Sequence, residues 1–150
     1  MRKIMFRGKT LDDGKWVYGY YVHQYGADEI YLFEPTDGFD SRHIDPDTVG
    51  EYTGFIDKNG KEIFTGDIVI GKTRKIQYDK FVGEAIFAHG TFYLRYPCRY
   101  CTDGYCWHRI GRVACDPTAG WRAEDGVPYD YEIIGNIYYN PEKLHKEVKW

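Results

Sequence analysis

Apolar and polar residues alternate with a period of two along most of the chain. Residues 15–22 (KWVYGYYV) and 29–35 (EIYLFEP) show this alternation on either side of a short turn, YGAD. It is typical of strands that bury one face of a sheet. Similar runs, broken near glycines, occupy residues 51–70, 75–96 and 131–138. The sequence therefore predicts a mainly β fold built from hairpins, in one or two small barrel-like domains.

Turn signals separate these runs. Asn59-Gly60 predicts a tight hairpin, because both residue types tolerate a positive φ. Residues 66–69 (GDIV) are interpreted as a turn leading into a strand, with Asp67 capping the turn. Residues 36–50 (TDGFDSRHIDPDTVG) are predicted to form an acidic loop, and they lack the ligand order of an EF-hand.

The C-terminal tail is the segment predicted to be helical, over about residues 141–149. Asn140 suits the cap position, Pro141 the first helical position, and Glu142 the positive end of the helix dipole. A helix this short is not stable alone. It is therefore expected to dock on the β body.

Charge and hydropathy exclude several classes of protein. The chain has 150 residues and a formal net charge of −3, which argues against a general polyanion binder. No apolar run is long enough to span a membrane, and the first residues lack the apolar core of a signal peptide. We therefore expect a cytoplasmic protein, with no membrane partner, whose thiols stay reduced unless they bind metal or react.

The segment PCRYCTDGYCWH, residues 97–108, carries the strongest chemical signal. Cys98 and Cys101 have the spacing of a metal knuckle, and Cys106 and Cys115 complete a candidate set of four thiolates, with His108 as an alternative ligand. Such a site predicts a structural zinc ion. Two alternatives stay open: reduced thiols that bind nothing, and a redox role, for which the strand-to-helix context is missing.

Aromatic and arginine residues interleave with these cysteines. The chain contains 15 Tyr, 8 Phe and 4 Trp, and aromatic side chains are enriched at protein interfaces. Arginine next to aromatic residues is also the composition of a surface that stacks single-stranded nucleic acid. The predicted partner-binding residues are Arg99, Tyr100, Tyr105, Trp107 and Arg109.

Three further blocks resemble the YopX family, whose members are encoded by bacteriophages and prophages. They are IMFRGKTLDDGKWVYGYYV (4–22), IDPDTVGEYTGFIDKNGKEIFTGDIV (44–69) and YEIIGNIYYNPEKL (131–144). The resemblance implies one unit over residues 1–150, or two small β subdomains at about 1–50 and 51–140. It also implies that residues 96–127, where the chain departs from the family, are a cysteine-rich insertion.

The resemblance supplies no catalytic motif, and the sequence has no G-x-S-x-G, P-loop or dinucleotide fingerprint. There is thus no positive reason to infer an enzyme. We expect a phage accessory protein in the host cytoplasm that binds a phage protein, a host protein or a second copy of itself. The alternative is a nucleic-acid-binding module that uses a zinc-stabilised cysteine hairpin.

Overall fold

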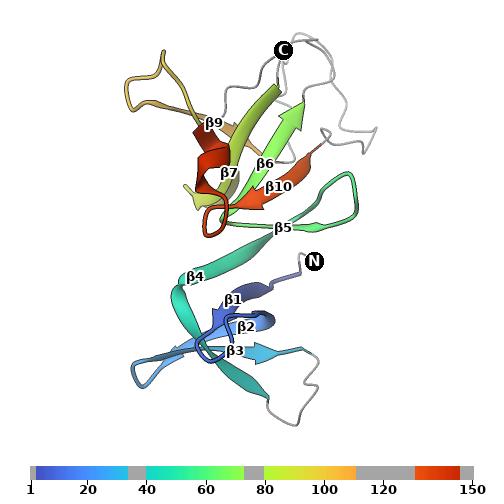
Figure 1. Cartoon of the computed structure of the whole chain (residues 1–150), viewed down its shortest axis with the longest axis vertical. Helices are drawn as coiled ribbons and strands as arrows, with labels where there is room; N and C mark the ends of the chain where they lie inside the picture. Colours follow the sequence, from blue (N-terminus) through green and yellow to red (C-terminus); the bar gives the residue numbers. More distant parts are fainter. Residues whose placement is uncertain (1–2, 34–39, 73–79, 111–130, 146–150) are drawn as a thin grey trace.

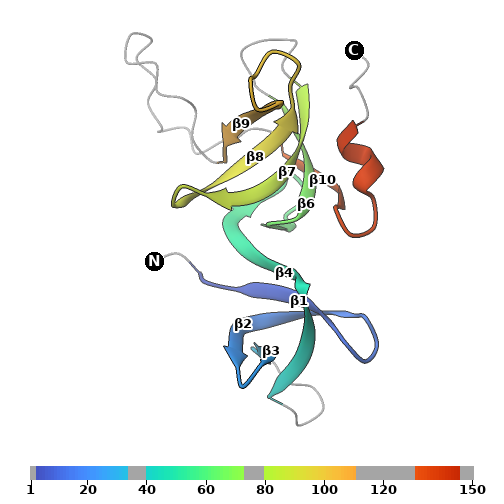
Figure 2. The ribbon, with the colours of Figure 1, turned by 90° about the vertical axis from the view of Figure 1, so that its left-hand side faces the viewer.

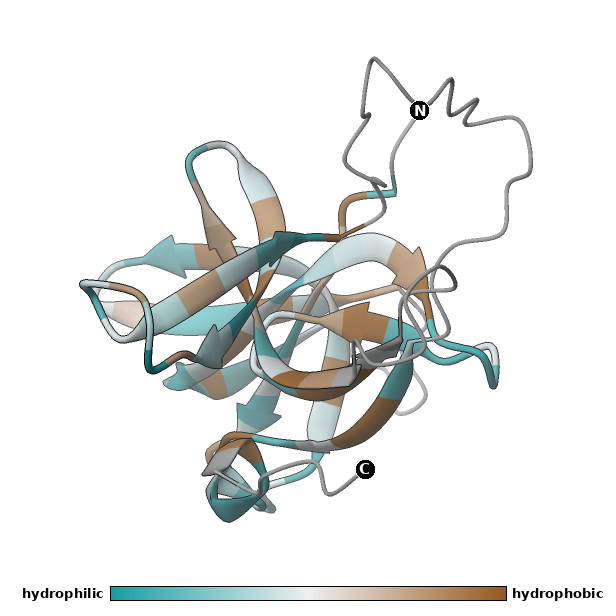
Figure 3. Cartoon of the chain, turned by 90° about the horizontal axis from the view of Figure 1, so that it is seen from above, coloured by the Kyte–Doolittle hydropathy of each residue, from teal (hydrophilic) through white to brown (hydrophobic). Residues whose placement is uncertain are grey.

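The computed structural model describes residues 3–33, 40–72, 80–110 and 131–145, which form two antiparallel sheets of five strands each (Figure 1). Apolar and polar residues alternate along the strands, as Figure 3 shows in brown and teal. The predicted mainly β fold is confirmed. The division into subdomains near residue 50 stays a prediction.

The first sheet has the strand order β1–β2–β3–β4–β5. Its strands are β1 (Phe6–Thr10), β2 (Trp16–Gln24), β3 (Ala27–Leu32), β4 (Ser41–Ile56) and β5 (Glu62–Phe64). Because β1 pairs with both β2 and β4, the first four strands close into a ring. Ile30 and Ile44 are fully buried. The predicted barrel-like character is thus found in this sheet.

The second sheet has the order β10–β6–β7–β8–β9. Its strands are β6 (Asp67–Lys72), β7 (Lys80–Ala88), β8 (Thr91–Pro97), β9 (Tyr105–Arg109) and β10 (Glu132–Asn136). One apolar cluster packs beneath it; its buried members are Ile63, Val69, Ala85, Phe92, Leu94, Ile110 and Tyr131. Since Ile63 belongs to β5, the first sheet also contributes to this core.

Two hairpins have two-residue turns that need left-handed backbone. Tyr25 and Gly26 have φ of 51° and 76°, and His89 and Gly90 have φ of 50° and 76°. Positive φ at both central positions gives the turn whose twist matches that of the flanking strands. At the predicted Asn59-Gly60 turn, only Gly60 has a positive φ, of 79°, and the loop is longer.

The predicted acidic loop over residues 36–50 is wrong for residues 41–50, which belong to β4. Ile44 and Thr48 face the interior. Between these two residues β4 forms a bulge, where its register with Arg7 and Lys9 of β1 shifts, and this interrupts the alternation of buried and exposed side chains. The Thr48 hydroxyl accepts a hydrogen bond from Lys9 N (2.8 Å) and donates one to Asp45 O (2.7 Å). The bulge thus hides the period of two that marks a strand.

The C-terminal helix begins at Pro141, as predicted, but it is a 3-10 helix, Pro141–His145. The remainder of the predicted helix, residues 146–149, lies outside the described residues. The short helix lies against β7, β8 and β10 (Figure 2). The expectation that it docks on the β body is confirmed for these five residues.

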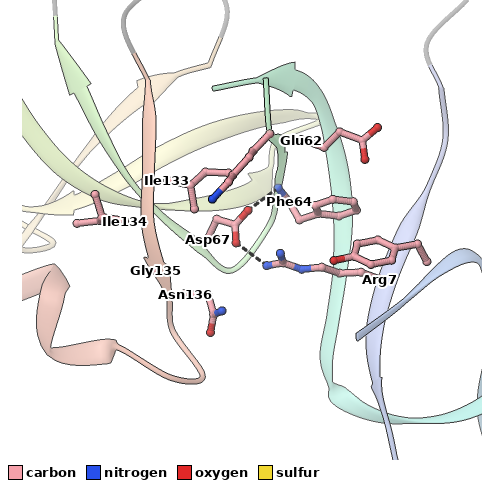
Figure 4. Close-up of a pocket in the computed structure, with 10 residues that line it drawn as sticks. Arg7, Glu62, Phe64, Asp67, Ile133, Ile134, Gly135 and Asn136 are labelled. Atoms are coloured by element: carbon pink, nitrogen blue, oxygen red, sulfur yellow. Dashed lines mark hydrogen bonds and ion pairs between the residues drawn. The ribbon is translucent and has the colours of Figure 1, made fainter. Parts of the chain in front are cut away.

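A buried ion pair joins the two sheets. Arg7 Nη2 on β1 lies 2.6 Å from Asp67 Oδ1 on β6, and Phe64 N donates to Asp67 Oδ2 at 2.9 Å (Figure 4). The Arg7 guanidinium packs 4.5 Å from the Trp16 ring centroid and 4.8 Å from that of Phe64. Burial raises the pKa of Asp67, and the Arg7 charge opposes this. Asp67 therefore caps its turn, as predicted, and also ties the sheets together.

Asp57 holds the β4–β5 loop against β10. Its Oδ1 accepts hydrogen bonds from Asn59 N (2.8 Å) and Lys61 N (2.9 Å), and its Oδ2 accepts one from Ile133 N (3.2 Å). Burial raises the pKa of Asp57, but the N–H groups of Lys61, Ile133 and Asn59 favour the carboxylate. Together they lower its pKa below the usual 3.8.

Replacing Asp57 by asparagine should lower the free energy of unfolding by about 1–3 kcal/mol at pH 7, because a buried hydrogen-bonded charge is lost. Since the folded pKa is lowered, the carboxylate stabilises the protein fully above pH 3.8 and loses this effect as the pH falls through the folded value. Urea unfolding at pH 7 and pH 3 should show a smaller acid-induced loss in the variant. Equal losses in both proteins would contradict this assignment.

Candidate functional site

The β8–β9 hairpin brings three cysteines together. Cys98 follows β8, Cys101 lies in the loop, and Cys106 is on β9. The Sγ atom of Cys101 lies 3.3 Å from that of Cys98 and 3.0 Å from that of Cys106. All three Sγ atoms lie within 4.8 Å of one another, and the three residues are half-buried. Within the described part of the chain, no other His, Cys, Asp or Glu group meets this geometry.

Local backbone bonds create this arrangement. Pairing of Tyr96 with Cys106 places β9 beside the end of β8. Cys98 N donates to Gly104 O at 2.8 Å, and Gly104 N donates to Cys101 O at 3.0 Å. Gly104 has a φ of 76°, which a residue with a side chain rarely adopts. The loop therefore folds back tightly enough for the Cys98 and Cys101 thiols to face the same point.

Asp103 braces the other side of this loop. Its carboxylate accepts hydrogen bonds from Tyr105 N (3.1 Å) and Trp107 Nε1 (3.3 Å). These two bonds lower the pKa of Asp103. The carboxylate thus orients the Trp107 indole on the surface of β9.

The thiols of Cys98 and Cys106 do not ionise alike. Hydrogen bonds from Cys106, from the Tyr100 backbone and from Cys101 lower the pKa of Cys98 to about 7. Hydrogen bonding to Cys101 and Cys98, together with burial, raises the pKa of Cys106 to about 12. Around pH 7 Cys98 therefore loses its proton more readily than Cys106, and the neighbouring thiols donate hydrogen bonds to it. A bound cation would favour release of their protons too.

The structure does not bring His108 into the three-thiol group. Its ring lies 4.9 Å from that of Phe81, and its Nε2 lies 3.3 Å from the Tyr131 hydroxyl. Burial lowers the pKa of His108, so the imidazole is neutral at pH 7. Cys115, the fourth predicted thiol, lies outside the described residues.

The predicted partner-binding residues are all exposed. Tyr105, Trp107 and Arg109 alternate along β9 and so share its outer face, while Cys106 and His108 point the other way. Arg99 and Tyr100 lie in the cysteine loop, and the Tyr100 side chain is almost fully exposed.

The outer face continues onto β8 and β7. Tyr93 pairs with Arg109, and its ring meets that of Trp107 edge-on at 5.7 Å. Arg95 lies 4.9 Å over the Tyr105 ring and forms an ion pair with Glu84 at 3.1 Å. Sequence reasoning did not place Tyr93 and Glu84 at this face. The alternation along residues 91–97 was the available signal, but the strand register was needed to use it.

The fold and the thiol cluster define a small all-β protein with a cysteine-bearing hairpin. The family model described as YopX protein matches residues 5–145, and the chain belongs to the YopX family. The predicted resemblance is thus confirmed.

Comparison with the curated proteins found no match. Among solved structures, the chain is similar to the crystal structure of protein EF1440 from Enterococcus faecalis. The identity is 23%, the match covers 96% of this chain and 99% of that chain, and the TM-score is 0.44.

Over the described residues, no helix has the length and apolar character needed to cross a bilayer.

Proposed function

We propose that this protein is a phage or prophage accessory protein that binds another protein through the β8–β9 hairpin, without catalysis. In this proposal a structural zinc ion at the cysteine cluster braces the hairpin. The observation that carries it is the arrangement of β9, where alternate residues form a thiol cluster on one face and an aromatic–arginine surface on the other. One face of β9 thus contacts the partner, while the other face binds the metal that supports the hairpin.

The thiol geometry supports zinc. Zn–S bonds of about 2.3 Å in a tetrahedral site separate the sulfur atoms by about 3.8 Å. The Sγ atoms of Cys98, Cys101 and Cys106 lie 3.0 and 3.3 Å apart along the cluster, so each needs to move by less than about 1 Å. Cys115 is our candidate for the fourth ligand, with His108 as the alternative.

The charge balance of the outer face favours a protein partner. Arg95 is paired with Glu84, and the Trp107 indole is held by Asp103. Glu84 and Asp103 thus place negative charge beside the aromatic residues of this face, whereas a polyanion site needs a basic surface. Exposed Tyr and Trp side chains are what protein interfaces use as anchors. The partner we propose is a phage or host protein in the host cytoplasm, or a second copy of the chain.

Replacing Trp107 by alanine should weaken partner binding by about 30-fold, as expected for an interface anchor worth about 2 kcal/mol. Affinity capture from phage-infected host cells would identify a partner. Titration calorimetry with that purified partner would then compare the native protein with the variant.

The matched control is Tyr25→Asn, which removes a fully exposed aromatic side chain from the β2–β3 turn. Asparagine tolerates the positive φ of this position. The control should bind like the native protein. Equal binding by native protein, control and Trp107→Ala would contradict the proposed surface.

Single-stranded nucleic acid is the second candidate partner, and one contact favours it. The Arg95 guanidinium lies over both the Tyr105 ring (4.9 Å) and the Trp107 ring (6.0 Å), which is a platform on which bases stack. Salt-dependent binding of a single-stranded oligonucleotide, lost in Arg99→Ala/Arg109→Ala, would favour this function. Absence of binding at low salt would remove it.

A further inference from the structure

A polar cavity of about 520 Å³ lies between the two sheets, and no residue of the cysteine-bearing β8–β9 hairpin lines it. Arg7 and Tyr18 line it from the first two strands, Lys61 from the β4–β5 loop, and Asp67 from β6, while residues 133–136 of β10 form a further wall (Figure 4). Its volume lies in the range of small-molecule sites.

The acceptors in this cavity already have partners. Asp67 uses one carboxylate oxygen for Arg7 and the other for Phe64 N. Glu62, on the exposed rim, forms an ion pair with Lys3 at 3.2 Å. The cavity therefore has little to offer a ligand that is mainly a hydrogen-bond donor.

The donors, in contrast, have capacity left. Among the described residues, no acceptor meets the Lys61 ammonium or the Tyr18 hydroxyl. Asp67 and the rings of Trp16 and Phe64 hold the Arg7 guanidinium in place. The site thus presents a fixed cation, a second cation that can move, and a hydroxyl.

We propose that this cavity binds an oxyanion, either carboxylate or phosphate, attached to a compact apolar or aromatic group. Lys61 and Tyr18 donate hydrogen bonds to the oxyanion, and Arg7 supplies a positive charge that needs no reorganisation. Ile133 and Phe64 line the same cavity and pack against the apolar part. This site goes beyond the proposed protein-binding function, because it uses none of the residues of the hairpin surface.

Titration calorimetry on the full chain tests the proposal with phenyl phosphate and benzoate as oxyanion probes, and phenol as the uncharged probe. At least one anion should bind, and phenol should not. The anion that binds more tightly identifies the preferred oxyanion. Lys61→Gln should raise the Kd about tenfold, since a charge-assisted hydrogen bond is lost.

Two further variants make the test specific. Lys58→Gln removes the same charge from the same loop, but Lys58 does not line the cavity and pairs with Glu132; its Kd should stay within about twofold of native. Glu62→Gln should lower the Kd, because it removes the negative charge from the rim. Lack of binding by both anions, equal binding of phenol, or equal effects of Lys61→Gln and Lys58→Gln would overturn the proposal.

Discussion

Replacing Asp67 by alanine should lower the free energy of unfolding by about 3–5 kcal/mol, the cost of leaving one member of a buried ion pair without its partner. The side chains of Arg7 and Asp67 are 9% and 3% exposed, so the Arg7 charge stays largely buried in the variant. The Phe64 N–H also loses its acceptor. Urea unfolding at pH 7, followed by circular dichroism, measures the effect.

Two controls separate the ion pair from a general effect of losing a charge. Lys3→Ala breaks the exposed pair with Glu62 and should cost at most about 1 kcal/mol. The double variant Arg7→Met/Asp67→Leu removes both buried charges and should recover the part of the loss that comes from the unpaired Arg7 charge, but not the part from the Phe64 N–H. If Asp67→Ala costs no more than Lys3→Ala, the ion pair does not stabilise the contact between the sheets.

Metal removal should have the second large effect. If free zinc exceeds its Kd about 1,000-fold, binding stabilises the folded protein by about 4 kcal/mol. For a chain of this length that corresponds to a fall in melting temperature of about 8–16 °C when a chelator removes the ion. Differential scanning calorimetry with and without chelator, in the presence of a thiol reductant, measures this shift.

Substitutions within the cluster should reproduce the loss. Cys101 contacts both other thiols, so Cys101→Ser should abolish zinc binding and make the melting temperature independent of chelator. Cys115→Ser and His108→Gln identify the fourth ligand, because only the variant that removes a ligand should weaken zinc binding. A chelator shift that persists in Cys101→Ser would show that zinc is bound elsewhere.

The fold was largely predictable because one face of each strand is buried. Residues 15–22 and 29–35 alternate clearly, and the structure pairs their strands through a tight turn. The strand over residues 41–50 was missed because the bulge near Asp45 and Pro46 breaks the alternation. A local pattern cannot reveal that pairing with β1 compensates for the interruption.

The candidate site was predictable in part. The sequence placed Cys98, Cys101 and Cys106 in one candidate ligand set, and the structure brings their sulfur atoms together through the pairing of β9 with β8. His108 was proposed from proximity in sequence, but its ring packs with Phe81.

The cavity was not predictable from the sequence. Its floor depends on a contact between Arg7 and Asp67, which are 60 residues apart. Residues that far apart form a site only once the strand order is known, and no local motif marks them. The sequence indicated a turn-capping role for Asp67, which is correct but describes only one of its two carboxylate oxygens.

X-ray absorption at the zinc edge, on protein produced without added metal, tests the central claim most directly. We expect about one zinc ion per chain, with at least three sulfur ligands at about 2.3 Å. Cys101→Ser, which should bind no zinc, should give no such spectrum. Protein that carries only a small fraction of an equivalent of zinc, and whose four cysteines react freely with a thiol reagent in the folded state, would contradict the account.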